Sequence, residues 1–153
     1  MDTKNTTYTD EVKKHFLNPH NMGEIKNADG VGKLGNPQCG DVFWLYISVT
    51  KNKKGEEIIK DIKFQTMGCA AAISTSSMIT DLAKGKTLEK AMKITNKDVA
   101  ESLKGLPLIK MHCSNMAADT LHEAIKDYLS KKNSKGKKIK IIKKEACYRC
   151  CNK

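Results

Sequence analysis

The sequence lacks a hydrophobic run long enough to cross a membrane. A spanning helix needs about 18 or more consecutive apolar residues, and no such stretch occurs among the 153 residues. Met1–Asn5 leads into further polar residues rather than an apolar leader, so we expect no secretory signal and a cytoplasmic protein without membrane contact. Thiols stay reduced in that compartment. The six cysteines are therefore predicted to be metal ligands or reactive thiols rather than disulfides.

Most of the chain also lacks an excess of positive charge. The formal net charge is +11, but residues 1–127 carry 18 Lys against 16 Asp and Glu, a net of +2. Residues 128–153 carry 9 Lys and 1 Arg against 1 Glu, a net of +9. The body therefore needs no polyanionic partner, and nucleic acid is not an expected ligand. We predict one domain over residues 1–130 and a Lys-rich linker with a Cys-containing tail over residues 131–153.

Apolar periodicity predicts an antiparallel strand pair followed by helices. Residues 41–50 alternate between apolar and polar, and residues 58–66 form a return strand after a turn at 51–55. Residues 27–40 are rich in glycine and are predicted to form a loop; because no Gly-Lys-Ser/Thr follows, it is not a phosphate-binding loop. Helices are expected over residues 8–17, 69–85, 87–92, 96–103 and from Ser114 to Tyr128.

Cys69 is expected at the N-terminus of the helix that follows the return strand, where partial positive charge favours a thiolate. The next eight residues, Ala-Ala-Ala-Ile-Ser-Thr-Ser-Ser, are mostly small. They permit two arrangements: a bulky group or partner close to the helix, or close packing of the helix on the sheet. His15 and His20, which flank the end of the first helix, are interpreted as packing or surface histidines rather than ligands.

Three cysteines occupy corners between expected elements: Cys39 before a strand, Cys69 after one, and Cys113 at the start of a helix. A compact fold can bring them together, and thiolates bind both zinc and iron–sulfur clusters. Asp41 and His112 are candidates for a fourth, replaceable ligand, which would hold a cluster less rigidly than a fourth cysteine. Spacing alone leaves open the alternative that the three are buried core thiols, because the body contains no Cys-x-x-Cys pair.

Several motifs, in order over about residues 8–129, resemble the iron–sulfur cluster scaffold proteins, specifically the N-terminal domain of nitrogen-fixation-type (NifU-like) scaffolds and their housekeeping (IscU-like) relatives. The matching segments are Tyr-Thr-Asp-Glu-Val at 8–12, His-Phe at 15–16, Asn-Pro at 18–19, Met-Gly-Glu at 22–24, Asn-Ala-Asp-Gly-Val-Gly at 27–32, Gly-Asn-Pro-Gln-Cys-Gly-Asp at 35–41, Phe-Gln-Thr-Met-Gly-Cys at 64–69, Lys-Gly-Lys at 84–86 and Lys-Met-His-Cys-Ser at 110–114.

The resemblance implies an α/β (α+β) fold with a small, mainly antiparallel three-stranded sheet and helices packed on one face. It implies that Cys39, Cys69 and Cys113 hold the cluster and accept sulfur, that Asp41 keeps the cluster labile and that His112 is an alternate ligand. The implied cargo is a transient 2Fe-2S cluster built from iron, with zinc as a substitute in isolated protein. The implied partners are a cysteine desulfurase, which hands over persulfide sulfur, and the apo-proteins that receive the cluster.

Two segments depart from the family pattern. Housekeeping members carry a Leu-Pro-Pro-Val-Lys loop that binds a heat-shock-type chaperone, whereas Leu106–Lys110 here reads Leu-Pro-Leu-Ile-Lys and has lost one proline. Longer members continue into a second cysteine-rich domain, whereas this chain ends shortly after Cys147, Cys150 and Cys151. A tail of this size is too short to fold alone, and we interpret it as disordered and without metal rather than as a metal-capturing arm.

Two other functions fit parts of the sequence. The same ligands would suit a structural or regulatory zinc protein whose basic tail binds nucleic acid. A cysteine-nucleophile enzyme using Cys113 and His112 is the weakest alternative, because adjacent residues seldom place a base correctly against a thiol and no substrate-binding motif accompanies them. We therefore predict a carrier rather than an enzyme.

Overall fold

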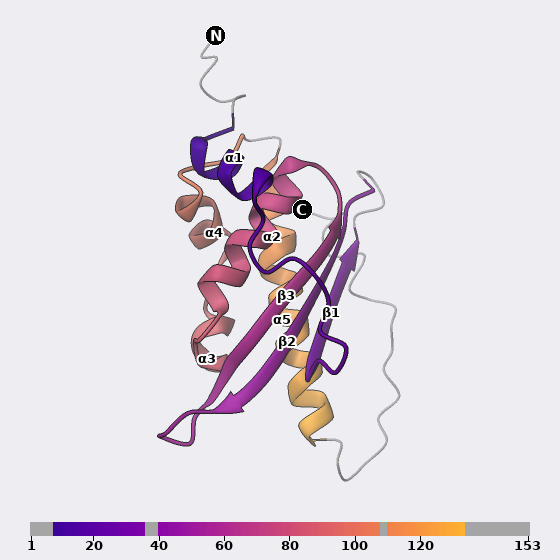
Figure 1. The fold of residues 1–153 in the computed structure, drawn as a ribbon, viewed down its shortest axis with the longest axis vertical. Helices are drawn as coiled ribbons and strands as arrows, with labels where there is room; N and C mark the ends of the chain where they lie inside the picture. The colour runs from indigo at the N-terminus through magenta and orange to yellow at the C-terminus, as the bar shows by residue number, and fades with distance from the viewer. Residues whose placement is uncertain (1–7, 36–39, 108–109, 134–153) are drawn as a thin grey trace.

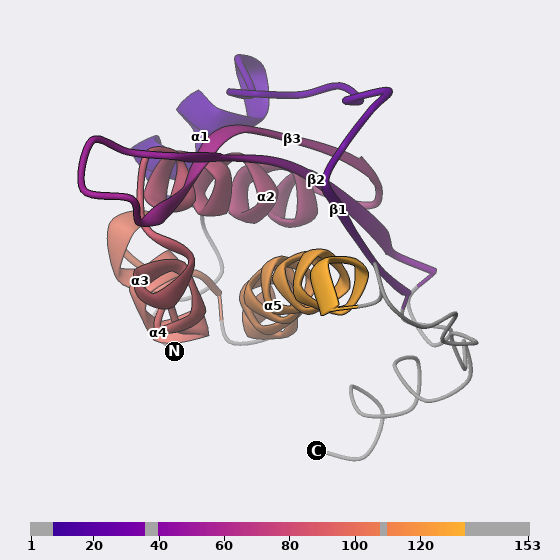
Figure 2. The ribbon, with the colours of Figure 1, turned by 90° about the horizontal axis from the view of Figure 1, so that it is seen from below.

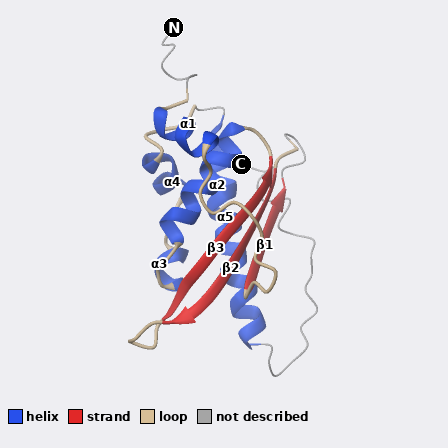
Figure 3. Ribbon diagram, viewed as in Figure 1, coloured by secondary structure: helices blue, strands red, loops and turns tan. Residues whose placement is uncertain are grey.

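The three-stranded sheet is antiparallel throughout. The computed structural model describes residues 8–35, 40–107 and 110–133. Its strands are β1 (Gly30–Gly35), β2 (Val42–Lys51) and β3 (Glu57–Met67), in the order β1-β2-β3 (Figure 3). The alternation predicted for residues 41–50 is confirmed, because Phe43, Leu45 and Ile47 are buried on the core face of β2. The predicted fold class is confirmed as well.

The prediction of a continuous loop over residues 27–40 was wrong, because residues 30–35 form the edge strand β1. Periodicity did not predict this strand, because its glycines hide the alternation of apolar and polar side chains. Their lack of side chains is required by the long helix α5 (Met111–Asn133), which packs against β1. A Cβ on Gly32 would collide with the carbonyl oxygen of Thr120 and lie 2.8 Å from the amide nitrogen of Ala124. The glycines therefore serve close packing between backbones and not flexibility.

Helices α2 and α5 lie side by side against one face of the sheet (Figures 1 and 2). Threonine side chains cap the shorter helices: Thr9 accepts from the Val12 amide and Thr87 from the Lys90 amide. The helix expected from Ser114 begins earlier, at Met111, so Cys113 lies inside its first turn. The remaining helices are α1 (Asp10–Leu17), α2 (Ala70–Ala83), α3 (Leu88–Met92) and α4 (Asn96–Ser102).

The small residues of α2 serve close packing, which decides between the two arrangements left open above. Ala71, Ala72 and the run 74–77 are buried, and α2 contacts α1, β3 and α5. The Ser74 hydroxyl donates a 2.7 Å hydrogen bond to the carbonyl of Val12 on α1. A helix that is buried on nearly every side needs small side chains, because its neighbours approach from several directions at once.

The division at residue 131 stays a prediction. Helix α5 continues through residues 131–133, and residues 134–153, which include Cys147, Cys150 and Cys151, lie outside the described part of the chain. Among the described residues, the helices are all too short or too polar to span a bilayer.

Candidate functional site

Asp41, Cys69 and Cys113 come together from three elements. Asp41 immediately precedes β2, Cys69 joins β3 to α2, and Cys113 lies in the first turn of α5. One ligand atom from each residue lies within 4.8 Å of the other two. The Cys113 Sγ is 3.8 Å from Asp41 Oδ2 and donates a hydrogen bond to it. Residues separated by up to 72 positions in the chain thus form one cluster of two sulfurs and one carboxylate.

The register of β2 and β3 places Asp41 beside Gly68, the residue that precedes Cys69. Val42 pairs with Met67, so Asp41 and Gly68 follow on adjacent strands. A Cβ on Gly68 would lie 2.9 Å from Asp41 Oδ1 and 2.8 Å from the Ala72 Cβ. Glycine at position 68 therefore creates the space in which the Asp41 carboxylate lies.

Burial differs strongly among the three ligands. Cys113 is fully buried and Asp41 is 6% exposed, whereas Cys69 is half-buried. Cys69 is the N-cap residue of α2, and its side chain makes no capping hydrogen bond. Of these three side chains, the Cys69 thiol is therefore the most open to a reactant from solvent.

Electrostatics keep the Cys113 thiol protonated in the metal-free protein. Burial raises its pKa most, and the nearby Cys69 and Asp41 raise it further, because each disfavours a second negative charge. Lys110 acts in the opposite direction. A metal ion must therefore displace the Cys113 proton before this thiolate can bind it.

Lys110 and Tyr8 belong to the site, although neither was predicted to be a site residue. The pKa of Lys110 is raised chiefly by the negative charge of Cys69, to which its ammonium group also hydrogen-bonds. The pKa of the Tyr8 hydroxyl is raised first by burial and then by Cys69. Both residues lie within motifs that carried the family resemblance, which was the available signal.

The donor set suits a thiophilic metal. Thiolate sulfur binds zinc and iron–sulfur iron, and a carboxylate oxygen is a harder, more exchangeable ligand for either. Two sulfurs and one oxygen leave room for a further ligand. Cys39 and the side chain of His112 lie outside the described residues, as do positions 108 and 109 of the Leu106–Lys110 loop. The ligand roles of Cys39 and His112 therefore stay predictions.

Comparison with known proteins finds relatives over most of the chain. A family described as the NifU-like N-terminal domain matches residues 7–135. The iron–sulfur cluster assembly scaffold protein IscU 1 of Archaeoglobus fulgidus is 60% identical over 135 residues, which cover 88% of this chain and 84% of that protein. The scaffold protein IscU of Escherichia coli K12 is 45% identical over 131 residues, which cover 84% and 98%.

Solved structures agree with this assignment at the level of the fold. The N-terminal part of a nitrogen-fixing NifU-like protein from Brucella abortus superposes with a TM-score of 0.65 at 13% identity, covering 80% of this chain and 94% of that one. At that identity the likeness shows the fold alone.

Proposed function

The chain belongs to the NifU-like N-terminal domain family of iron–sulfur cluster assembly scaffolds, and we propose that it builds the cluster on Asp41, Cys69 and Cys113. The observation that carries this proposal is the convergence of these three ligands within 4.8 Å. Cys39 completes the thiolate set in this proposal, and His112 is an alternate ligand. The cargo is a 2Fe-2S cluster, for which three cysteines and one carboxylate supply the four protein ligands that the two irons need. Zinc occupies the same site when iron and sulfur are withheld.

Sulfur arrives as a persulfide on a cysteine desulfurase. A scaffold thiolate attacks the outer sulfur, a new S–S bond forms on the scaffold, and the desulfurase leaves as a thiolate. Exposure favours Cys69 as the first acceptor, because Cys113 is buried and protonated. Two electrons from an external donor then reduce the transferred sulfur to sulfide, which bridges iron.

Asp41 makes the cluster releasable through its charge as well as through its oxygen ligand. Its carboxylate lies against Cys113 Sγ and raises the pKa of that thiol. A raised pKa favours protonation of Cys113, and a protonated thiol no longer binds iron. Recipient apo-proteins thus take the cluster from a site that holds one of its ligands weakly.

The protein acts as a carrier and not as an enzyme in this scheme, since it releases what it assembles and turns over no small substrate. A heat-shock-type chaperone that binds Leu106–Lys110 would act at the first turn of α5, because Cys113 follows that loop directly. The loss of one proline predicts that such binding is weaker than in the housekeeping members.

The test is anaerobic reconstitution of the full chain with ferrous iron, cysteine and a desulfurase. We expect a brown protein with visible absorption and a 2Fe-2S Mössbauer spectrum. A colourless protein that keeps zinc under the same conditions would instead support the zinc-protein alternative. Salt-dependent DNA binding that is lost on removal of residues 133–153 would support the nucleic-acid role of the tail.

Asp41→Ala should lengthen the lifetime of the assembled cluster. Removing the carboxylate lowers the pKa of Cys113 and stabilises its bond to iron, so transfer to an apo-protein should slow by about tenfold, or about 1.4 kcal/mol in the barrier. Decay of visible absorption in the presence of an apo-ferredoxin measures it. Asp119→Ala, at an exposed position on the same helix as Cys113, is the matched control. An unchanged cluster lifetime in Asp41→Ala would show that Asp41 does not make the cluster labile.

A further inference from the structure

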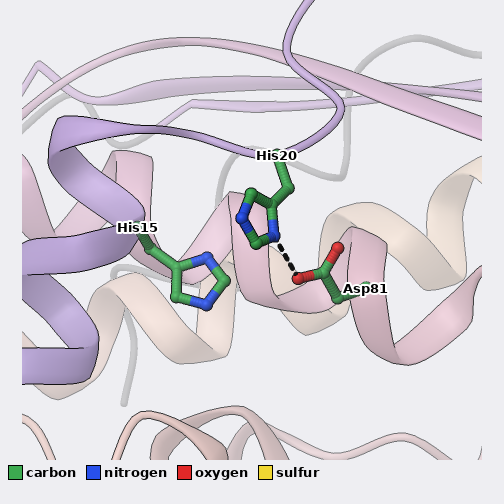
Figure 4. A group of neighbouring side chains, drawn as sticks. All are labelled: His15, His20 and Asp81. Atoms are coloured by element: carbon green, nitrogen blue, oxygen red, sulfur yellow. Dashed lines mark hydrogen bonds and ion pairs between the residues drawn. The ribbon is translucent and has the colours of Figure 1, made fainter.

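Two histidines and an aspartate form a second group of potential ligands away from the thiols (Figure 4). His15 comes from α1, His20 from the segment after it, and Asp81 from α2. The His20 Nδ1 is 2.6 Å from Asp81 Oδ2, and the two imidazole rings are 4.7 Å apart between centroids. One ligand atom from each residue lies within 4.8 Å of the other two.

Hydrogen bonds connect the segment after α1 to one face of α2. Ser77, Thr80 and Asp81 are spaced three and four positions apart, so they lie on the same side of that helix. The Ser77 hydroxyl accepts a 2.8 Å hydrogen bond from the His20 backbone amide. The Asn21 side-chain amide donates to Thr80 Oγ1 at 3.1 Å and to Asp81 Oδ1 at 3.2 Å. These hydrogen bonds place His20 beside Asp81.

We propose that His15, His20 and Asp81 form a second metal site, which binds a divalent first-row transition-metal ion such as Zn²⁺ or Fe²⁺ with water in the remaining positions. Two imidazoles and one carboxylate are a donor set that proteins use for both ions. Both histidines were interpreted from the sequence as packing or surface residues. Asp81 lies more than 60 residues away in the chain, and only the fold brings it to them.

Neighbouring groups already hold the ligands in suitable orientations. Ser77 Oγ lies 2.7 Å from His15 Nδ1, so Nε2 is the nitrogen that we assign to the metal. The Asn21 side-chain amide donates to Asp81 Oδ1, so Asp81 Oδ2 is the oxygen that faces His20. Such outer partners are typical of metal-binding histidines and carboxylates. Burial lowers the pKa of His15, so its imidazole is neutral at pH 7 and binds a metal ion without first losing a proton.

The group has room and freedom to close around an ion. Metal–ligand bonds of about 2.0–2.2 Å in a tetrahedral site place the donor atoms roughly 3.4 Å apart. The group, whose ligand atoms lie within 4.8 Å, must therefore contract, while His20 Nδ1 and Asp81 Oδ2, now 2.6 Å apart, must separate slightly. The side chains of His20 and Asp81 are 49% and 36% exposed, so they can move in this way. A hollow of about 460 Å³ borders both histidines and admits water ligands. Glu11 lines it as well, and its carboxylate adds negative charge close to His15.

The second site is separate from the thiol cluster. Ser77 and Asp81 follow Cys69 by 8 and 12 residues along α2, which corresponds to about 12 and 18 Å at 1.5 Å per residue. Its ligands include no sulfur. Failure of one site therefore says nothing about the other, and the two can be measured in the same protein.

The experiment is an anaerobic Zn²⁺ titration of the ¹⁵N-labelled full chain, followed through the imidazole nitrogen resonances. Thiols take up the first zinc. We expect the resonances of His15 and His20 to shift as zinc is added in excess of the thiol sites, and to return when a chelator is added. The resonances of His122, which bonds the Ile94 carbonyl on another face, should not move.

Asp81→Asn and His20→Gln are the test variants. Both positions are partly exposed, so both variants should fold, which thermal unfolding verifies. Each should weaken zinc binding at the histidines by at least about 100-fold, since loss of an outer partner alone commonly costs about 10- to 100-fold. Histidine resonances that stay unchanged in excess zinc, or an Asp81→Asn protein that titrates like the wild type, would contradict the metal site. The three residues would then serve only to hydrogen-bond α2 to the segment that follows α1.

Discussion

The two ligand clusters lie at different positions along the same helix and differ in almost every physical respect. Asp41, Cys69 and Cys113 gather at the start of α2 with sulfur donors, and two of the three are buried. His15, His20 and Asp81 gather farther along α2 with nitrogen and oxygen donors, and two of the three are partly exposed. The first cluster suits a cargo that must be shielded from water, and the second suits an ion that exchanges with solvent.

Burial acts on both clusters by the same rule and with opposite consequences for pKa. It raises the pKa of Cys113 and lowers that of His15, because it disfavours the charged thiolate and the charged imidazolium alike. Both groups are therefore neutral at pH 7. A neutral imidazole is already a ligand, whereas a neutral thiol is not, so metal binding at Cys113 releases a proton and binding at His15 does not.

Gly32→Ala should produce the largest change in stability, and it should disturb the thiol cluster without disturbing the histidine cluster. The added methyl group meets the backbone of α5 at Thr120 and Ala124 and forces the helix away from the sheet. We expect a loss of about 3 kcal/mol in the free energy of unfolding, at the upper end of overpacking costs, measured by urea denaturation. Cys113 is on α5 and should become reactive toward thiol reagents, whereas the histidine cluster has no ligand on α5.

Gly35→Ala is the matched control for that change. It lies on the same strand, and its added Cβ would meet nothing closer than 3.8 Å, so the free energy of unfolding should change by less than about 0.5 kcal/mol. Equal losses for the two alanines would show that glycine serves backbone flexibility in β1 and not the approach of α5.

Raising the pH should weaken the metal-free fold through Cys113. An unfolded thiol ionises near about pH 8.5, whereas burial keeps the folded Cys113 protonated to higher pH. The unfolded chain therefore loses the proton first. The free energy of unfolding should be flat below about pH 8 and fall above it by up to about 1.4 kcal/mol per pH unit.

The window for this measurement ends near pH 10, where the raised pKa values of Tyr8 and Tyr128 begin to contribute. Denaturation curves in chelator at pH 7.5, 8.5 and 9.5 measure the slope, and Cys113→Ala should flatten it. A slope that persists in Cys113→Ala would place the titrating group elsewhere.

Lys110→Met should give the smallest effect, and it concerns the exposed side of the thiol cluster. Loss of the ammonium group that hydrogen-bonds Cys69 removes about 1 kcal/mol of attraction to the thiolate. Alkylation of Cys69 by iodoacetamide at pH 7.5 should slow roughly fivefold, as mass spectrometry of the modified peptide measures. Lys126→Met on α5 is the control, because Lys126 pairs with Glu123 and not with the site. An unchanged rate would assign Lys110 to a different role.

Local patterns were sufficient for much of the fold. Alternation predicted β2 and β3, and the helical periodicity predicted α1 to α4 close to their observed bounds, because these signals depend on residues close in the chain. Strand β1 was not predicted, because its glycines are required by close contact with α5, which lies about 90 residues later in the sequence.

The site divides in the same way. Cys69, Cys113 and Asp41 could be named as candidates from residue type and local setting, but their exposure could not. The difference between a half-buried Cys69 and a buried, protonated Cys113 depends on how β3, α2 and α5 pack together. Lys110 stood within a recognised motif, yet its charge acquired a role only through its proximity to Cys69.

By itself, the sequence determined the candidate metal ligands by residue type, the strands β2 and β3 and the family to which the chain belongs, because motifs and short-range periodicity are written in consecutive residues. The tertiary structure alone decided which thiol faces solvent, why β1 consists of glycine at the α5 contact, and that His15 and His20 meet Asp81. Each of these depends on contacts between residues far apart in the chain, and such contacts exist only after the helices have packed on the sheet.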